Sequence, residues 1–137
     1  MKTIGYFDEF LHPRVRLIVK GLRKSLRIDP IIDTGFDGYL CLPVKTAVQL
    51  GLELYGESRV ELADGSKKNE LSFLGSVLWQ DQERPARIFL TDSKDALIGN
   101  GLFQGQKLSI NYVNYVASIA PVAVAKSGEP KKRKPKK

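Results

Sequence analysis

The stretch IIDTGFDG, at residues 31–38, places Asp33 between an apolar pair and a tight turn. The two isoleucines favour a strand because they are β-branched, whereas Gly35 and Gly38 permit backbone angles that other residues avoid. The stretch therefore predicts an acid at the point where a buried strand breaks into a turn. An isolated aspartate at such a position can simply hydrogen-bond its own turn, so the rest of the chain has to decide its role.

Apolar runs separated by turn residues predict a mostly β chain with two short helices. Pro43 followed by VKTAVQL and Gly51 is typical of one compact helix, and Asn100 is expected to cap a second helix that runs to Gln104. The ADGS sequence predicts a hairpin turn between two of the strands. We expect strands at residues 14–20, 25–33, 39–42, 59–62, 69–79, 87–90, 108–112 and 115–124.

The length of 137 residues, 42% of them apolar, is sufficient for one domain with a real core. The net charge of +7 is concentrated at the end of the chain, where residues 126–137 hold seven lysines or arginines and one glutamate. We therefore predict one domain over residues 1–124 and a disordered basic tail over residues 125–137. The tail is either a solubilising extension or a weak, non-specific contact to an anionic partner such as nucleic acid.

The sequence also predicts the cellular compartment of the protein. No run approaches the roughly 18 apolar residues that a membrane span requires, and the N-terminus MKTIGYFDEF does not resemble a secretory signal. Cys41 is the only cysteine and has no partner within the chain for a disulfide, which agrees with a reducing environment. These features predict a cytoplasmic protein without a membrane span.

Several classes of site are not supported by the sequence. His12 is the only histidine and has no partner at metal-ligand spacing, so we expect no metal site. Ser66 and Ser76 have no histidine placed to act as a base, and GNGLFQG lacks the lysine of a phosphate-binding loop. We therefore expect no cofactor.

The motifs DTGFDGYLCLP, LGL, LADGS and LIGNGLFQGQKLSI follow one another in the order found in a known family. Between residues 13 and 119 the chain resembles the retropepsin-like aspartic proteases, the single-lobe group that includes the retroviral proteases, and especially a microbial branch with a DTGF loop. The resemblance implies a single-lobe acid-protease β-barrel. It also implies hydrolysis of peptide bonds by a water molecule that is activated between two aspartates.

The chain contains only one D-T-G sequence and is too short for a two-lobed arrangement. The resemblance therefore implies a homodimer with one catalytic Asp33 from each protomer, related by a twofold axis. In the active-site loop, Thr34 would form a hydrogen-bonded grip across that axis, and Gly35 would donate its N–H to the carboxylate. Phe36 replaces the hydroxyl residue that is common in pepsin-like loops, which predicts activity at weakly acidic to near-neutral pH.

The resemblance also implies supporting and substrate-binding residues. Leu97, Ile98 and Gly99 are expected to brace the loop from behind, and residues 59–79 to form a flap. An extended peptide or protein substrate would contact residues next to the loop and at the flap tip, namely Asp37, Gly38, Ala63, Asp64 and Gly65. Residues 108–119 are expected in the dimer interface.

Two alternatives remain open from the sequence. The polar flap tip and the unusual C-terminal region allow a non-proteolytic dimerisation or peptide-binding module of the same fold. A weaker alternative is a nucleic-acid partner that binds through its basic tail.

Overall fold

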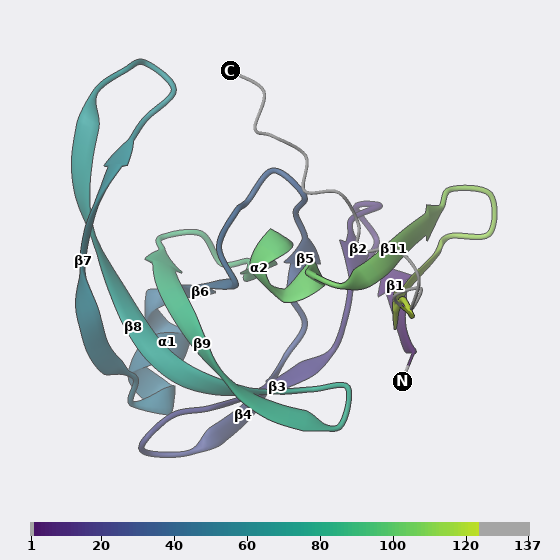
Figure 1. Cartoon of the computed structure of the whole chain (residues 1–137), viewed down its shortest axis with the longest axis horizontal. Helices are drawn as coiled ribbons and strands as arrows, with labels where there is room; N and C mark the ends of the chain where they lie inside the picture. The colour runs from purple at the N-terminus through teal and green to yellow at the C-terminus, as the bar shows by residue number, and fades with distance from the viewer. Residues whose placement is uncertain (1, 124–137) are drawn as a thin grey trace.

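The computed structural model describes residues 2–123, apart from the side chain of Val60, so the predicted basic tail lies outside the described residues. The chain is mostly β with two short helices, as predicted (Figure 1). Its elements in chain order are β1 (Thr3–Phe7), β2 (Pro13–Arg14), β3 (Leu17–Lys20), β4 (Ser25–Ile28), β5 (Ile31–Ile32), β6 (Leu40–Pro43), α1 (Val44–Leu50), β7 (Glu53–Glu61), β8 (Lys67–Trp79), β9 (Gln82–Thr91), β10 (Leu97–Ile98), α2 (Asn100–Phe103), β11 (Gln106–Asn111) and β12 (Val116–Pro121).

The strands form one continuous, strongly curved sheet with the order β11-β12-β1-β2-β5-β10-β6-β9-β8-β3-β4, and β7 pairs with β8. Most pairs are antiparallel, but β10 runs parallel to β5 and β6 runs parallel to β9. The parallel pair of β5 and β10 brings together segments from the first and last thirds of the chain. In Figure 1 these two strands and α2 lie between the long β7–β8 hairpin and the β11–β12 hairpin.

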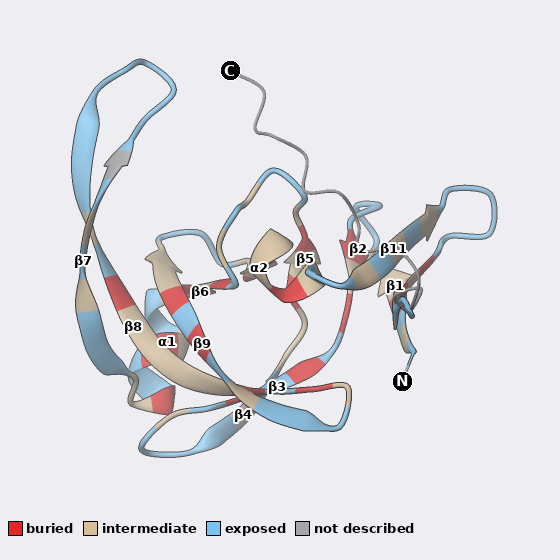
Figure 2. Cartoon of the chain, viewed as in Figure 1, coloured by how far each residue is buried: buried red, intermediate tan, exposed pale blue. Residues whose placement is uncertain are grey.

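The core forms because alternate strand residues point into the curve of the sheet. In β3, Leu17 and Val19 are buried while the two residues between and after them are exposed. Trp79 at the end of β8 is only 2% exposed and belongs to this core. Figure 2 shows that burial is concentrated in the body, whereas the far half of the β7–β8 hairpin is largely exposed.

Helix α1 follows the predicted pattern. Pro43 is its N-cap residue, and Gly51 ends it with a φ of 72°, from which its N–H donates to the Ala47 carbonyl oxygen at 3.0 Å. A left-handed residue at this position favours glycine because a Cβ would be strained there. Among the described residues, neither helix is long or apolar enough to cross a bilayer.

Two expected strands are interrupted. The predicted strand at residues 25–33 divides into β4 and β5, with Pro30 buried between them. Proline has no N–H for the ladder, but its carbonyl oxygen accepts a hydrogen bond from the Val15 N–H at 3.3 Å. The predicted strand at residues 14–20 divides in a similar way into β2 and β3.

Several strands extend beyond the predictions from the sequence, and β7 begins at Glu53 rather than at residue 59. No strand was predicted for residues 3–7, yet β1 pairs with β12 in the register Thr3 with Ile119. Strand β9 begins at Gln82 rather than at residue 87, because Gln80 and Asp81 adopt φ values of 53° and 63° and form a two-residue turn. The polar residues after this turn pair with β8 in an exposed part of the sheet and do not form a loop.

Candidate active site

Asp33 follows directly after β5 and is held there by β10. The parallel register pairs Leu97 with Ile31 and Ile98 with Ile32, and the Asp33 N–H donates to the Ile98 carbonyl oxygen at 3.0 Å. Ile32 and Ile98 are both buried. The backbone of the acid is therefore fixed by a packed element rather than carried on a mobile turn.

The turn after Asp33 orients its carboxylate. The Gly35 N–H donates to Asp33 Oδ1 at 2.9 Å, and the Phe36 N–H donates to the Asp33 carbonyl oxygen at 3.1 Å. A Cβ on Gly35 would lie 3.3 Å from the same Oδ1, a tight contact for a side chain. No hydrogen bond from within residues 2–123 reaches the other oxygen, Oδ2, so one side of the carboxylate remains available to water or to a second acid.

The start of α2 holds the far part of the loop. The backbone N–H groups of three consecutive residues donate to loop carbonyl oxygens at 2.8–3.0 Å, as Gly99 to Tyr39, Asn100 to Phe36, and Gly101 to Gly38. The loop is therefore fixed along its whole length.

The expectation that Asn100 caps α2 is wrong. Gly99 is the N-cap residue, without a side-chain cap hydrogen bond, and Asn100 is the first residue of the helix. The Asn100 side chain instead turns outward and donates from Nδ2 to the Thr34 carbonyl oxygen at 2.9 Å. This contact places Asn100 among the residues that support the loop.

Gly99 makes the close packing of the two segments possible. It is buried, and a Cβ at this position would overlap the carbonyl oxygens of Phe36 and Gly38, the latter at 2.5 Å. Leu97, Ile98 and Gly99 thus lie directly behind the loop, where the sequence analysis expected them.

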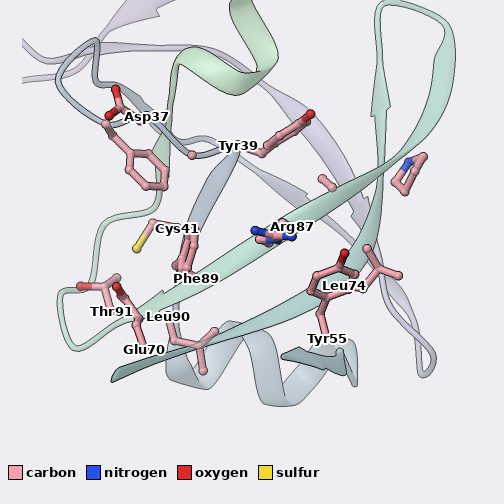
Figure 3. A pocket seen from close by; sticks show the side chains of 14 residues that line it. Asp37, Tyr39, Cys41, Tyr55, Glu70, Leu74, Arg87, Phe89, Leu90 and Thr91 are labelled. Carbon is pink, nitrogen blue, oxygen red and sulfur yellow. The ribbon is translucent and has the colours of Figure 1, made fainter. Parts of the chain in front are cut away.

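A cavity of about 1130 Å³ opens beside the loop (Figure 3). Its wall on the loop side includes Phe36, whose ring meets that of Phe89 edge to face with centroids 6.3 Å apart. Asp37 and Gly38, which the sequence predicted to contact substrate, also line it, but Asp33 itself does not. The lining consists of Phe36, Asp37, Gly38, Tyr39, Cys41, Tyr55, Glu70, Leu74, Pro85, Ala86, Arg87, Phe89, Leu90 and Thr91.

Most of the cavity wall belongs to β6, β9 and β8, and several of its side chains share one face of these strands. The registers place Cys41 beside Phe89, Phe89 beside Ser72, and Leu74 beside Arg87. Because side chains alternate between faces, Glu70 projects to the same side as Ser72 and Leu74. The sequence analysis missed this set of residues, since only the strand register reveals which face they share.

Cys41 belongs to this wall. Burial raises the pKa of its thiol to about 11, and the nearby charge of Glu70 adds to the shift. The protonated thiol therefore acts as an apolar part of the wall at neutral pH.

The predicted flap corresponds to the β7–β8 hairpin, whose tip lies away from the body (Figure 1). The tip is closed by the Leu62 N–H, which donates to the Ser66 carbonyl oxygen at 2.7 Å. The hydroxyl and N–H of Ser66 donate to Asp64 and lower the pKa of its carboxyl. Ala63, Asp64 and Gly65 are all exposed and do not line the cavity.

Thr34 is exposed at the turn of the loop. Its carbonyl oxygen is bonded to Asn100, whereas no hydrogen bond of its hydroxyl occurs within residues 2–123. The predicted grip across a twofold axis needs a second protomer and stays a prediction.

Comparison with solved structures identifies the architecture. A retropepsin-like aspartic protease from Rickettsia conorii superposes with a TM-score of 0.62 at 17% sequence identity, over 88% of this chain and 91% of that chain. The chain has the retropepsin-like fold. EIAV protease in complex with an inhibitor superposes with a TM-score of 0.54 at 14% identity, over 72% of this chain and 90% of that one. No protein-family model matches the sequence, and no curated protein matches it.

The retropepsin-like fold accounts for the arrangement of the loop and its brace. Within residues 2–123, no group of three or more histidine, cysteine or acidic side chains is placed to hold a metal ion.

Proposed function

We propose that the protein is a homodimeric aspartic endopeptidase in which the Asp33 carboxyls of two protomers activate one water molecule. The observation that carries this proposal is the state of the Asp33 carboxylate at the end of a braced strand. Its Oδ1 accepts a hydrogen bond from Gly35, whereas no group within residues 2–123 donates to its Oδ2. The retropepsin-like fold agrees with it.

The chemistry requires two carboxyls that share one proton. The ionised Asp33 removes a proton from water as the water oxygen attacks the carbonyl carbon of the scissile peptide bond. The protonated Asp33 of the partner protomer gives its proton to the carbonyl oxygen, which forms a neutral gem-diol. In the collapse of this intermediate, Asp33 gives the proton that it took from water to the amide nitrogen, and the ionised carboxyl of the partner protomer removes a proton from one hydroxyl of the gem-diol. The C–N bond breaks, an amine and a carboxylic acid are released, and the pair again shares one proton.

The C-terminal region is the proposed dimer interface. Strand β11 forms one end of the strand order, so the outer side of its backbone has no strand partner within the described residues. The turn that joins it to β12 exposes apolar side chains, among them Val113 at 89% and Tyr112 at 62%. Contact with a second protomer would remove these side chains from water.

The working conditions are also part of the proposal. Phe36 cannot donate a hydrogen bond to the catalytic carboxylates and adds apolar bulk beside them, so we propose activity at weakly acidic to near-neutral pH. The lone Cys41, protonated and unpaired in the described structure, suits a reducing compartment such as the cytoplasm.

The proposal is tested by digestion of casein and of a peptide library with wild-type protein and with Asp33→Asn. Sedimentation must show the same dimer content in both preparations. Cleavage by the wild type and a loss of at least about 1,000-fold in Asp33→Asn is expected. Equal rates in the two proteins contradict the proposal.

The second candidate is a peptide-binding module of the same fold without proteolysis. The observation that favours it is that Phe36 is the first residue in the sequence that lines the cavity, so the cavity wall does not include Asp33. This candidate predicts saturable binding of peptides with no products from the wild type, even after long incubation at any pH between 4 and 8.

A further inference from the structure

Glu70 is the one carboxylate on the β8 part of the cavity wall. It is half-buried and lies between residues that are mainly aromatic or aliphatic. Within residues 2–123 it has neither an ion pair nor a side-chain hydrogen bond. A carboxylate that is partly removed from water without a partner is costly, so a cationic ligand group would be favoured beside it.

Among residues 2–123, Arg87 is the only cation that lines the cavity, but it is not the partner of Glu70. Arg87 pairs with Leu74 on β8, four residues from Glu70, which corresponds to about 13 Å along a strand. Its guanidinium lies over the Tyr55 ring, 4.5 Å from the centroid. In Figure 3 Arg87 and Tyr55 lie toward one end of the cavity and Glu70 toward the other.

This separation also decides whether Arg87 would repel a cation at Glu70. Exposed charges are screened over about 8 Å at physiological ionic strength, so the two ends of the cavity act nearly independently. The Glu70 end is walled by Cys41, Leu90 and Thr91, as Figure 3 shows. Such a wall can pack against the methylene groups of a lysine or arginine while the carboxylate binds the charged head.

We propose that Glu70 is a specificity-determining residue that selects a lysine or arginine side chain of an extended peptide. The inference rests on the proposed function for its substrate class, a peptide bound across the cavity. It adds where in the cavity one side chain of the peptide binds, and that this side chain is positively charged.

The test uses two series of proteins. In the first, Asp33→Asn protein that cannot cleave is titrated with fluorescent peptides in which one residue is varied between lysine and its neutral isostere norleucine. In the second, active protein is profiled on a peptide library. Glu70→Gln is compared with Glu57→Gln, which removes the same charge from the same hairpin at an exposed position outside the cavity.

We expect one peptide position at which lysine or arginine is preferred by about 10- to 100-fold, as for a hydrogen bond to a charged group. The preference should disappear in Glu70→Gln, persist in Glu57→Gln, be partly retained in Glu70→Asp, and reverse toward acidic residues in Glu70→Arg. The far-ultraviolet circular dichroism spectrum and the melting temperature show whether each variant is folded.

The outcomes separate this inference from the proposed function. Cleavage without a basic preference, or with one that Glu70→Gln retains, overturns the inference and leaves the endopeptidase proposal standing. Glu70-dependent binding of basic peptides without cleavage by the wild type supports the inference and contradicts the endopeptidase proposal. Absence of any peptide binding overturns both.

Discussion

The side-chain amide of Asn100 donates a hydrogen bond to the backbone carbonyl of Thr34 and so ties the first residue of α2 to the loop that follows Asp33. Removal of this bond in Asn100→Ala should lower the free energy of unfolding by about 1 kcal/mol and reduce peptide turnover, because the loop loses one of its supports. Urea unfolding and initial rates measure the two effects. Gln49→Ala, on the exposed face of α1, is the control and should change neither.

The close packing of Gly99 predicts that alanine is much more destabilising at this position than at Gly56. A Cβ at Gly99 would overlap backbone atoms of Phe36 and Gly38, whereas a Cβ at Gly56 would meet nothing within 4 Å. Neither glycine has a positive φ, so the difference is steric. Gly99→Ala should destabilise by about 3 kcal/mol and Gly56→Ala by no more than about 0.5 kcal/mol. Equal urea midpoints for the two variants would contradict the close packing of Gly99 against Phe36 and Gly38.

The strand before the loop could be predicted from the sequence because it is a local pattern, whereas the brace was expected only from the resemblance to a family. The apolar pair before D-T-G predicts a strand that ends at the acid, and β5 confirms this. Strand β10 and its parallel pairing with β5 were not predicted. The helix α1 was predicted from a local pattern, since Pro43 and Gly51 mark its ends.

The cavity could not be predicted, because its composition depends on strand register. Glu70 and Arg87 belong to strands whose registers bring them to the same face, and a shift of one residue would turn both away. Strand β1 was missed because its partner β12 lies more than 100 residues later in the chain. The side chain of Asn100 was misread because its partner, Thr34, is distant in sequence.

Asp8 predicts a pH dependence of stability. The backbone N–H of His12, together with the Arg14 guanidinium at 2.6 Å and the Phe10 N–H, lowers the pKa of the Asp8 carboxyl to about 2. A carboxyl with a depressed pKa in the folded state stabilises the fold above its unfolded pKa, about 3.9, and this contribution is lost as the pH falls toward 2.

The variant Asp8→Asn should therefore be less stable than the wild type at pH 5, and the difference should shrink as the pH is lowered from 4 toward 2. Thermal unfolding over this range at constant ionic strength measures the difference. A constant difference at every pH would mean that the carboxylate charge has no part in the interaction.

Cys41 predicts slow alkylation. With a pKa of about 11, its thiolate at pH 8 is roughly 100 times less abundant than that of an ordinary cysteine, whose pKa is about 8.5. Iodoacetamide should react correspondingly slowly, somewhat faster in Glu70→Gln, and more slowly still when peptide fills the cavity. Mass spectrometry follows the reaction, with glutathione as the reference thiol. Reaction as fast as that of glutathione would contradict the described burial.

Subunit exchange tests whether activity needs two Asp33 carboxyls. When wild-type protein is mixed with a threefold excess of Asp33→Asn, random exchange leaves about one quarter of the wild-type subunits in homodimers. Peptidase activity should fall to that level with the time course of exchange. An equal excess of serum albumin is the control. Unchanged activity after complete exchange would show that one Asp33 is sufficient.

The open side of β11 has a consequence for a chain that lacks the proposed second protomer. A strand edge with unpaired N–H and C=O groups is a template on which other chains can add and aggregate. Strand β11 carries a single charged residue, Lys107, to discourage such addition. Excess unassembled chains should therefore be prone to precipitation, and interface mutations should first become visible as poor yield from expression rather than as reduced catalysis.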